Sequence, residues 1–156
     1  MKKWIVYVLM LAVIPVLSFG GLGGEDVGKL SPVQVVKISP EKEGLRIVTD
    51  EGQCGWGRDV ASAVEKMKAT SSASVFLDTA DYLLLEPGTE AWLPKLQQYL
   101  RPSCSVCYVS ATVDPSEAAT YLRFHQPNLT LAQYEAGQRE LPTLIYNEGR
   151  MTLVQF

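Results

Sequence analysis

The sequence predicts an α/β protein, a single-domain layered fold with a mixed β-sheet and about four helices. Three observations support this prediction. The chain has 156 residues, within the ~100–200 residues usual for one domain. Hydrophobic residues make up 47% and charged residues 20%, as in soluble globular proteins. Apolar runs typical of strands alternate with segments whose apolar residues recur at helical spacing.

The N-terminal segment is predicted to lie outside this fold. An apolar run at 4–17 contains no charged side chain, follows two lysines and precedes small residues at 18 and 20. This is the pattern of a secretory signal peptide at 1–20, and it predicts an exported, extracytoplasmic protein, secreted or held at the outer face of the cytoplasmic membrane. An uncleaved signal anchor is the alternative. The glycine-rich segment 21–29 predicts a flexible tether, which leaves 30–156 as one α/β domain.

Strands are predicted where apolar and β-branched residues run or alternate, at 33–38, 45–49, 75–77, 82–85, 106–111, 143–146 and 151–154. The continuous apolar run at 75–77 is typical of a central strand that is buried on both faces. The loop containing glycine between the last two runs predicts a closing hairpin. The segment 50–58 is predicted to be a loop, because it contains three glycines.

Helices are predicted at 59–68, over about a dozen residues around 92–100, at 114–124 and at 130–137. Asp59 is a candidate N-cap for the first of them. The signal at Asp114 is the strongest, because Pro115 and Glu117 then occupy the N1 and N3 positions that they favour. Thr130 is expected to cap the last helix.

The charge balance restricts the class of partner. The net charge is −3, so there is no basic stripe to bind a nucleic-acid backbone. An acidic chain is also repelled by anionic lipid head groups, which argues against electrostatic membrane binding. No cofactor motif is present, and with a single histidine no nucleophile–base set can be recognised. We therefore expect no cofactor and a protein partner at the cell envelope.

The cysteines allow several alternative roles. Cys104 and Cys107 form a CxxC motif, which a thiol-redox protein would use if both sulfurs lay at a helix N-terminus. The segment around Cys107 favours a strand instead, which predicts a small buried apolar side chain. Cys54 and Cys104 are the pair to test for a disulfide in an oxidising compartment. Together with His125, the three cysteines would form a zinc set, although only one CxxC is present.

Two further groups of residues are candidates for ligand binding. Asp78 and Asp81 follow the apolar run at 75–77, and carboxylates at the end of a strand can bind a cation or act as acid and base. They can equally cap local backbone amides. Trp56 and Arg58, in the glycine-rich segment, are candidates for a ligand-holding loop, or Trp56 can simply pack on the sheet.

The sequence carries two resemblances to known families. The stretches 55–64, 75–85, 100–103 and 108–111 resemble the N-terminal domain of spore germinant-receptor C subunits, over about residues 33–124. That resemblance implies an exported protein that assembles at the outer face of the spore's inner membrane. Residues 141–150 resemble the cis-proline strand and closing hairpin of thioredoxins, and Pro94 resembles the proline of their second helix. This likeness places residues 86–89 at the redox position, where no cysteine occurs.

These observations predict an exported, non-catalytic binding or assembly domain at the cell envelope, and the first resemblance implies a sporulation or germination context. One alternative is a thiol-redox protein that uses Cys104 and Cys107. A second alternative is a protein that binds a small molecule or a cation at Asp78 and Asp81.

Overall fold

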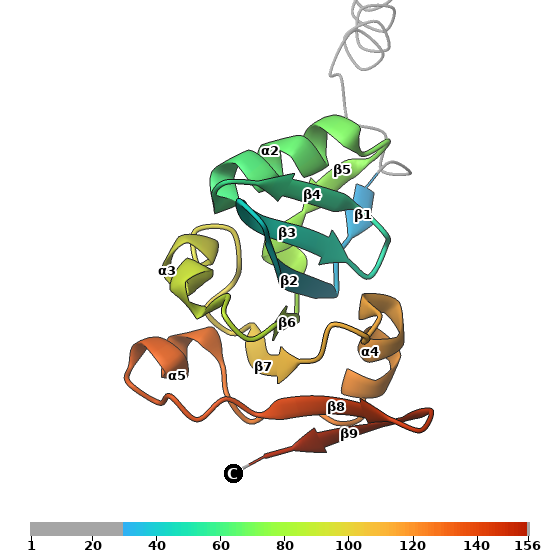
Figure 1. Cartoon of the computed structure of the whole chain (residues 1–156), viewed down its shortest axis with the longest axis vertical. Helices are drawn as coiled ribbons and strands as arrows, with labels where there is room; N and C mark the ends of the chain where they lie inside the picture. The colour runs from blue at the N-terminus through green and yellow to red at the C-terminus, as the bar shows by residue number, and fades with distance from the viewer. Residues whose placement is uncertain (1–29, 156) are drawn as a thin grey trace, which may run out of the picture.

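The structure is a computed structural model that describes residues 30–155 (Figure 1). The expected signal peptide at 1–20 and the expected tether at 21–29 lie outside the described residues. In chain order the elements are β1 (Leu30–Pro32), β2 (Val35–Glu41), β3 (Gly44–Thr49), β4 (Cys54–Gly57), α2 (Val60–Thr70), β5 (Ser74–Phe76), β6 (Tyr82–Leu85), α3 (Leu93–Leu96), β7 (Ser105–Val109), α4 (Pro115–Leu122), α5 (Leu131–Glu135), β8 (Thr143–Asn147) and β9 (Arg150–Val154).

A seven-stranded mixed sheet organises the domain, in the order β4-β3-β2-β6-β7-β8-β9. Strands β2, β6, β7 and β8 are parallel and form its centre. Strands β3, β4 and β9 run antiparallel to their neighbours at the two margins. The predicted α/β class, mixed sheet and closing hairpin are confirmed. Among residues 30–155, no helix combines the length and apolar character needed to cross a membrane.

Helices cover both faces of the sheet and create two buried clusters. The larger cluster joins one face of the strands to α2, α3 and α5. The smaller one joins the opposite face to α4. Strand β6 contributes to both, with Leu83 and Leu85 in the larger cluster and Tyr82 and Leu84 in the smaller. Its four residues are all buried, as expected of a central strand with helices on both sides.

The predicted N-caps are confirmed. The Asp59 carboxylate accepts the Ser62 N–H at 2.8 Å, and Asp114 accepts the Ser116 N–H at the same distance. Thr130 caps α5 through the N–H of Gln133. These side chains satisfy donors that the first helical turn leaves free.

The central position predicted for 75–77 is wrong. Strand β5 pairs only with β1, in a separate two-stranded parallel sheet. Phe76 is exposed, and a short 3₁₀ turn begins at Leu77. The Thr79 hydroxyl bonds both the N–H and the carbonyl of Val33, which fixes this turn against the start of β2. The central place belongs to β6, the run at 82–85.

Two other predictions need correction. The segment 50–58 is not all loop, because β4 forms an edge strand within it. The expected helix around 92–100 is shorter: a 3₁₀ turn at Glu90–Trp92 leads into α3, with Pro94 in its first turn. After α3 the chain continues as turns, as shown by the hydrogen bond from the Tyr99 N–H to the Leu96 carbonyl.

Candidate binding surface on the open face of the sheet

The CxxC thiols are buried on opposite faces of the sheet. Cys104 packs in the larger cluster and Cys107 in the smaller one, and both are free thiols. Burial raises the pKa of Cys104 to about 12, with Asp81 adding to the effect, and burial likewise raises the pKa of Cys107 to about 12. A redox thiol needs the opposite, an accessible sulfur with a lowered pKa. The geometry therefore favours a structural role for the pair.

The proposed disulfide and zinc set are not assembled. Four steps between neighbouring strands separate β4, which contains Cys54, from β7, which follows Cys104. At ~4.8 Å per step this is roughly 19 Å, whereas bridged cysteines need Cα atoms within ~7 Å. His125 stacks on the Tyr121 ring with centroids 4.2 Å apart. Within the described residues, no three His, Cys, Asp or Glu side chains are grouped to hold a metal ion.

Asp78 and Asp81 precede the central strand rather than follow it. Asp81 comes directly before β6, at the amino ends of the parallel strands, whereas ligands of open α/β sheets bind at the carboxyl ends. Its carboxylate lies 2.6 Å from the Arg101 guanidinium, in an exposed ion pair. Asp78 borders a separate small hollow beside Phe76 and Tyr99. The structure thus pairs Asp81 with Arg101 and places neither carboxylate in the hollow that Trp56 lines.

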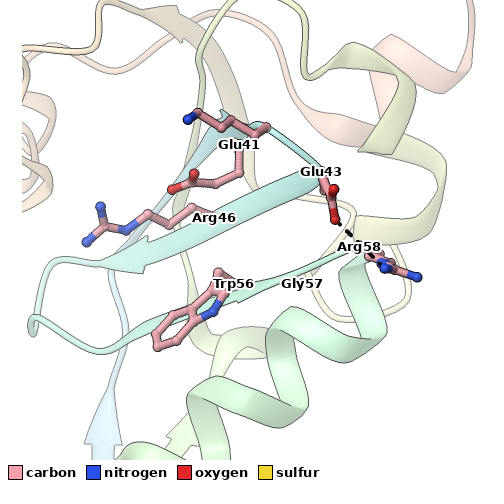
Figure 2. A pocket seen from close by; sticks show the side chains of 7 residues that line it. Glu41, Glu43, Arg46, Trp56, Gly57 and Arg58 are labelled. Atoms are coloured by element: carbon pink, nitrogen blue, oxygen red, sulfur yellow. Dashed lines mark ion pairs between the residues drawn. The ribbon is translucent and has the colours of Figure 1, made fainter.

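Trp56 and Arg58, in contrast, line one hollow of about 580 Å³ (Figure 2). Trp56 points away from α2 because Gly55 and Gly57 occupy the face that packs against this helix. A Cβ atom on either glycine would overlap atoms of α2. Successive residues of a strand face opposite sides, so the Trp56 indole emerges on the face opposite α2, where it is 51% exposed. Helix α4 packs on this face mainly against β2, and the part over β3 and β4 that it leaves uncovered forms the open face.

Arg46 lies at the centre of this hollow. It is the cross-strand partner of Trp56 on one side and of Ser39 on the other. Figure 2 shows its side chain between those of Glu41 and Trp56. Its Nε donates to the Cys54 sulfur at 3.2 Å, and this hydrogen bond raises the pKa of Arg46. The guanidinium is therefore a fixed positive charge beside an exposed indole.

Other charges surround the same hollow. Its lining comprises Glu41, Lys42, Glu43, Arg46, Trp56, Gly57 and Arg58. Arg58 and Glu43 form a 3.8 Å ion pair whose side chains are almost fully exposed, so it contributes little to stability. The Lys66 ammonium reaches round from α2 to lie 4.5 Å from the centre of the Trp56 ring.

A second hollow, of about 450 Å³, shares Glu41 and Arg46 with the first. It lies at the carboxyl ends of β2, β6 and β7, where Lys37 and Glu86 form a buried ion pair. The sequence analysis did not identify Lys37 or Arg46. Lys37 interrupts the apolar run at 33–38, which was an available signal of a buried charge.

Comparison with protein-family models, curated proteins and solved structures finds no match. The chemistry of the site therefore has to be argued from its residues. An indole face and a guanidinium are the groups most enriched where proteins bind other proteins. The lining of the first hollow includes no serine, threonine, cysteine or histidine. In the second hollow the Ser39 hydroxyl donates to the Glu86 carboxylate at 2.7 Å, and Lys37 is paired with the same carboxylate. The first hollow thus combines groups that are suited to binding a partner.

Proposed function

We propose that this protein is a non-catalytic binding domain that docks an envelope protein on the open face over β3 and β4. One observation carries the proposal: Trp56, half-exposed, adjoins Arg46 in a hollow that helix α4 does not cover. A large exposed aromatic side chain beside an arginine is typical of interface anchors, which contribute most of the binding free energy. Scattered exposed apolar residues elsewhere need no such explanation.

The sequence supports the location of this partner. The signal-peptide pattern at 1–20 indicates export, and the net charge of −3 disfavours anionic membranes and nucleic acids. An exported binding domain would meet its partner outside the cytoplasm. The likeness to germinant-receptor C subunits is consistent with a partner in a spore or cell-envelope assembly.

A site-specific crosslink tests the proposal. A photoreactive amino acid replaces Trp56 in the expressed protein, and a matched variant carries it at Phe124, which at 83% is the most exposed large apolar side chain among residues 30–155. We expect irradiation of intact cells to give one discrete adduct from position 56, identified by mass spectrometry as an envelope protein. Adding Arg46→Gln should abolish that adduct. Equal adducts from both positions, or none from position 56, would contradict the proposal.

A further inference from the structure

The hollow around Trp56 is locally cationic in an acidic protein. Its lining holds three cationic side chains, Lys42, Arg46 and Arg58, against the carboxylates of Glu41 and Glu43. Lys66 adds a fourth cation at the indole ring. The whole chain, by contrast, has a net charge of −3. Charge complementarity between interface patches selects a partner of opposite sign, here an anionic group.

Arg46 is a cation of this hollow with free binding capacity. Its Nε is occupied by the Cys54 sulfur, but no hydrogen bond or ion pair within residues 30–155 engages its two terminal nitrogens. Those nitrogens form the planar fork that matches a carboxylate. Lys37 in the neighbouring hollow cannot serve instead, because its ammonium already binds Glu86 and two backbone carbonyls.

The Trp56 indole determines which kind of chemical group should lie next to the anion in a bound partner. Trp56 is directly opposite Arg46 in the register of β3 and β4, so a carboxylate held by the guanidinium would place its neighbouring group over the ring edge. Burying part of an indole that is 51% exposed favours an apolar side chain there. A bare inorganic anion would leave this surface in water.

The edge of β9 is a less suitable docking place. The Leu153 N–H, on the outer side of this strand, donates to the Tyr121 hydroxyl of α4 at 3.1 Å. The Gln155 side chain bonds the backbone of Gln126 and Asn128. The Tyr121 side chain and the backbone of the loop after α4 are therefore already bonded to this end of the chain, and an incoming strand would have to displace them.

We infer that the hollow recognises an acidic segment of the partner protein, in which a carboxylate side chain that binds Arg46 adjoins an apolar side chain that packs on Trp56. This inference rests on the proposed function and specifies the chemistry of the partner. The segment continues along the open face toward the second hollow, which Arg46 and Glu41 also line.

Titration with short blocked peptides, followed by NMR at the Trp56 indole N–H, tests this inference. The probe is acetyl-Ala-Phe-Asp-Ala-amide, compared with its Phe-Asn and Ala-Asp counterparts. We expect saturable binding of the Phe-Asp peptide, weakened at least about tenfold in each counterpart, as the loss of one charged or one apolar anchor implies. Arg46→Gln should weaken the Phe-Asp peptide equally. The matched change Arg150→Gln, at the exposed β8–β9 hairpin, should leave its affinity unchanged.

Several outcomes would overturn the inference. Equal affinity for the Phe-Asp and Phe-Asn peptides would remove the role of the carboxylate. An equal response to inorganic phosphate, or to vesicles that contain anionic lipid, would make the hollow a general anion site. If no peptide binds while the crosslink at position 56 still depends on Arg46, the binding function stands and the acidic-segment inference falls.

Discussion

The Lys37 ammonium lies 3.1 Å from the Glu86 carboxylate, with side chains only 7% and 13% exposed. Lys37 also donates to the carbonyls of Ala111 and Val113, at 2.8 Å each, so all three of its protons are used. The Ser39 hydroxyl donates to the same carboxylate at 2.7 Å. The network ties the end of β2 to the end of β6 and to the loop after β7. The network therefore fixes the rim beside the open face.

Lys37→Met should therefore destabilise the protein strongly. The change leaves the Glu86 carboxylate and two carbonyls without their donor, and breaking one side of a buried pair costs about 3–5 kcal/mol. Urea denaturation gives the free energy of unfolding. Lys42→Met, at an exposed position on the adjacent turn, is the control and should change it by less than ~0.5 kcal/mol. A loss below about 1 kcal/mol for Lys37→Met would mean that water reaches the pair.

The two buried thiols predict a loss of stability in alkali. In the folded protein the pKa of Cys104 and of Cys107 is raised to about 12, chiefly by burial. An unfolded cysteine ionises near ~8.5, so the fold's preference for neutral thiols is fully favourable below that pH. As the pH rises from ~8.5 toward 12, the unfolded state loses protons first and the free energy of unfolding falls.

Denaturation at about pH 8 and about pH 10.5 measures this fall. Cys107→Ala should make it shallower, because one of the two thiols no longer titrates. The burial of Tyr108, whose pKa is also raised to about 12, acts in the same direction and remains in the variant. Native alkylation gives an independent check: Cys54, half-buried, should react well before Cys104 and Cys107. Equal rates at all three would show that the thiols are not protected.

The features predicted correctly from sequence are local ones. Asp59, Asp114 and Thr130 cap helices because a cap involves only residues within one turn of it. The central strand could not be assigned in this way. The apolar runs at 75–77 and 82–85 look alike in isolation, and only long-range pairing places the second one between β2 and β7.

The residues of the candidate site, too, could be predicted only as far as local sequence patterns allow. Trp56 and Arg58 could be identified because they are large side chains with polar groups in a segment rich in glycine. Where the glycines pack closely against a neighbouring element, these two side chains must lie on the outside. Arg46 could be assigned to the face opposite Leu45 and Ile47 by alternation alone. That it adjoins Trp56 depends on the register of β3 against β4, which the loop between them, not the strands themselves, determines.

The Asp114 N-cap of α4 is expected to make a modest contribution to the free energy of unfolding. Asp114 accepts hydrogen bonds from the Ser116 hydroxyl and from the N–H groups of Ser116 and Glu117, and these bonds lower its pKa. Asp114→Ala should reduce the free energy of unfolding by ~1 kcal/mol, as is usual for a lost N-cap. Asp114→Asn keeps an acceptor and should recover most of the loss. Asp78→Ala, at an exposed carboxylate, is the matched control, and an equal effect there would contradict the capping role.

The close contact between β4 and α2 gives the sharpest test of how the open face is built. A Cβ atom on Gly55 would overlap the Ala63 carbonyl oxygen and crowd Met67, so Gly55→Ala must push α2 away from the strand. Overpacking of this kind costs about 1–3 kcal/mol. The shift should also move the Lys66 ammonium from the Trp56 ring and change the indole fluorescence. Gly52→Asn is the control: asparagine tolerates a positive φ such as the +82° found here better than most side chains do, and no atom lies within 4 Å of the new Cβ. Its loss of stability should therefore be smaller than that of Gly55→Ala, and the indole fluorescence should stay nearly unchanged. If the two variants behave alike, Gly55 does not set the distance of α2 from β4, and the exposure of Trp56 has another cause.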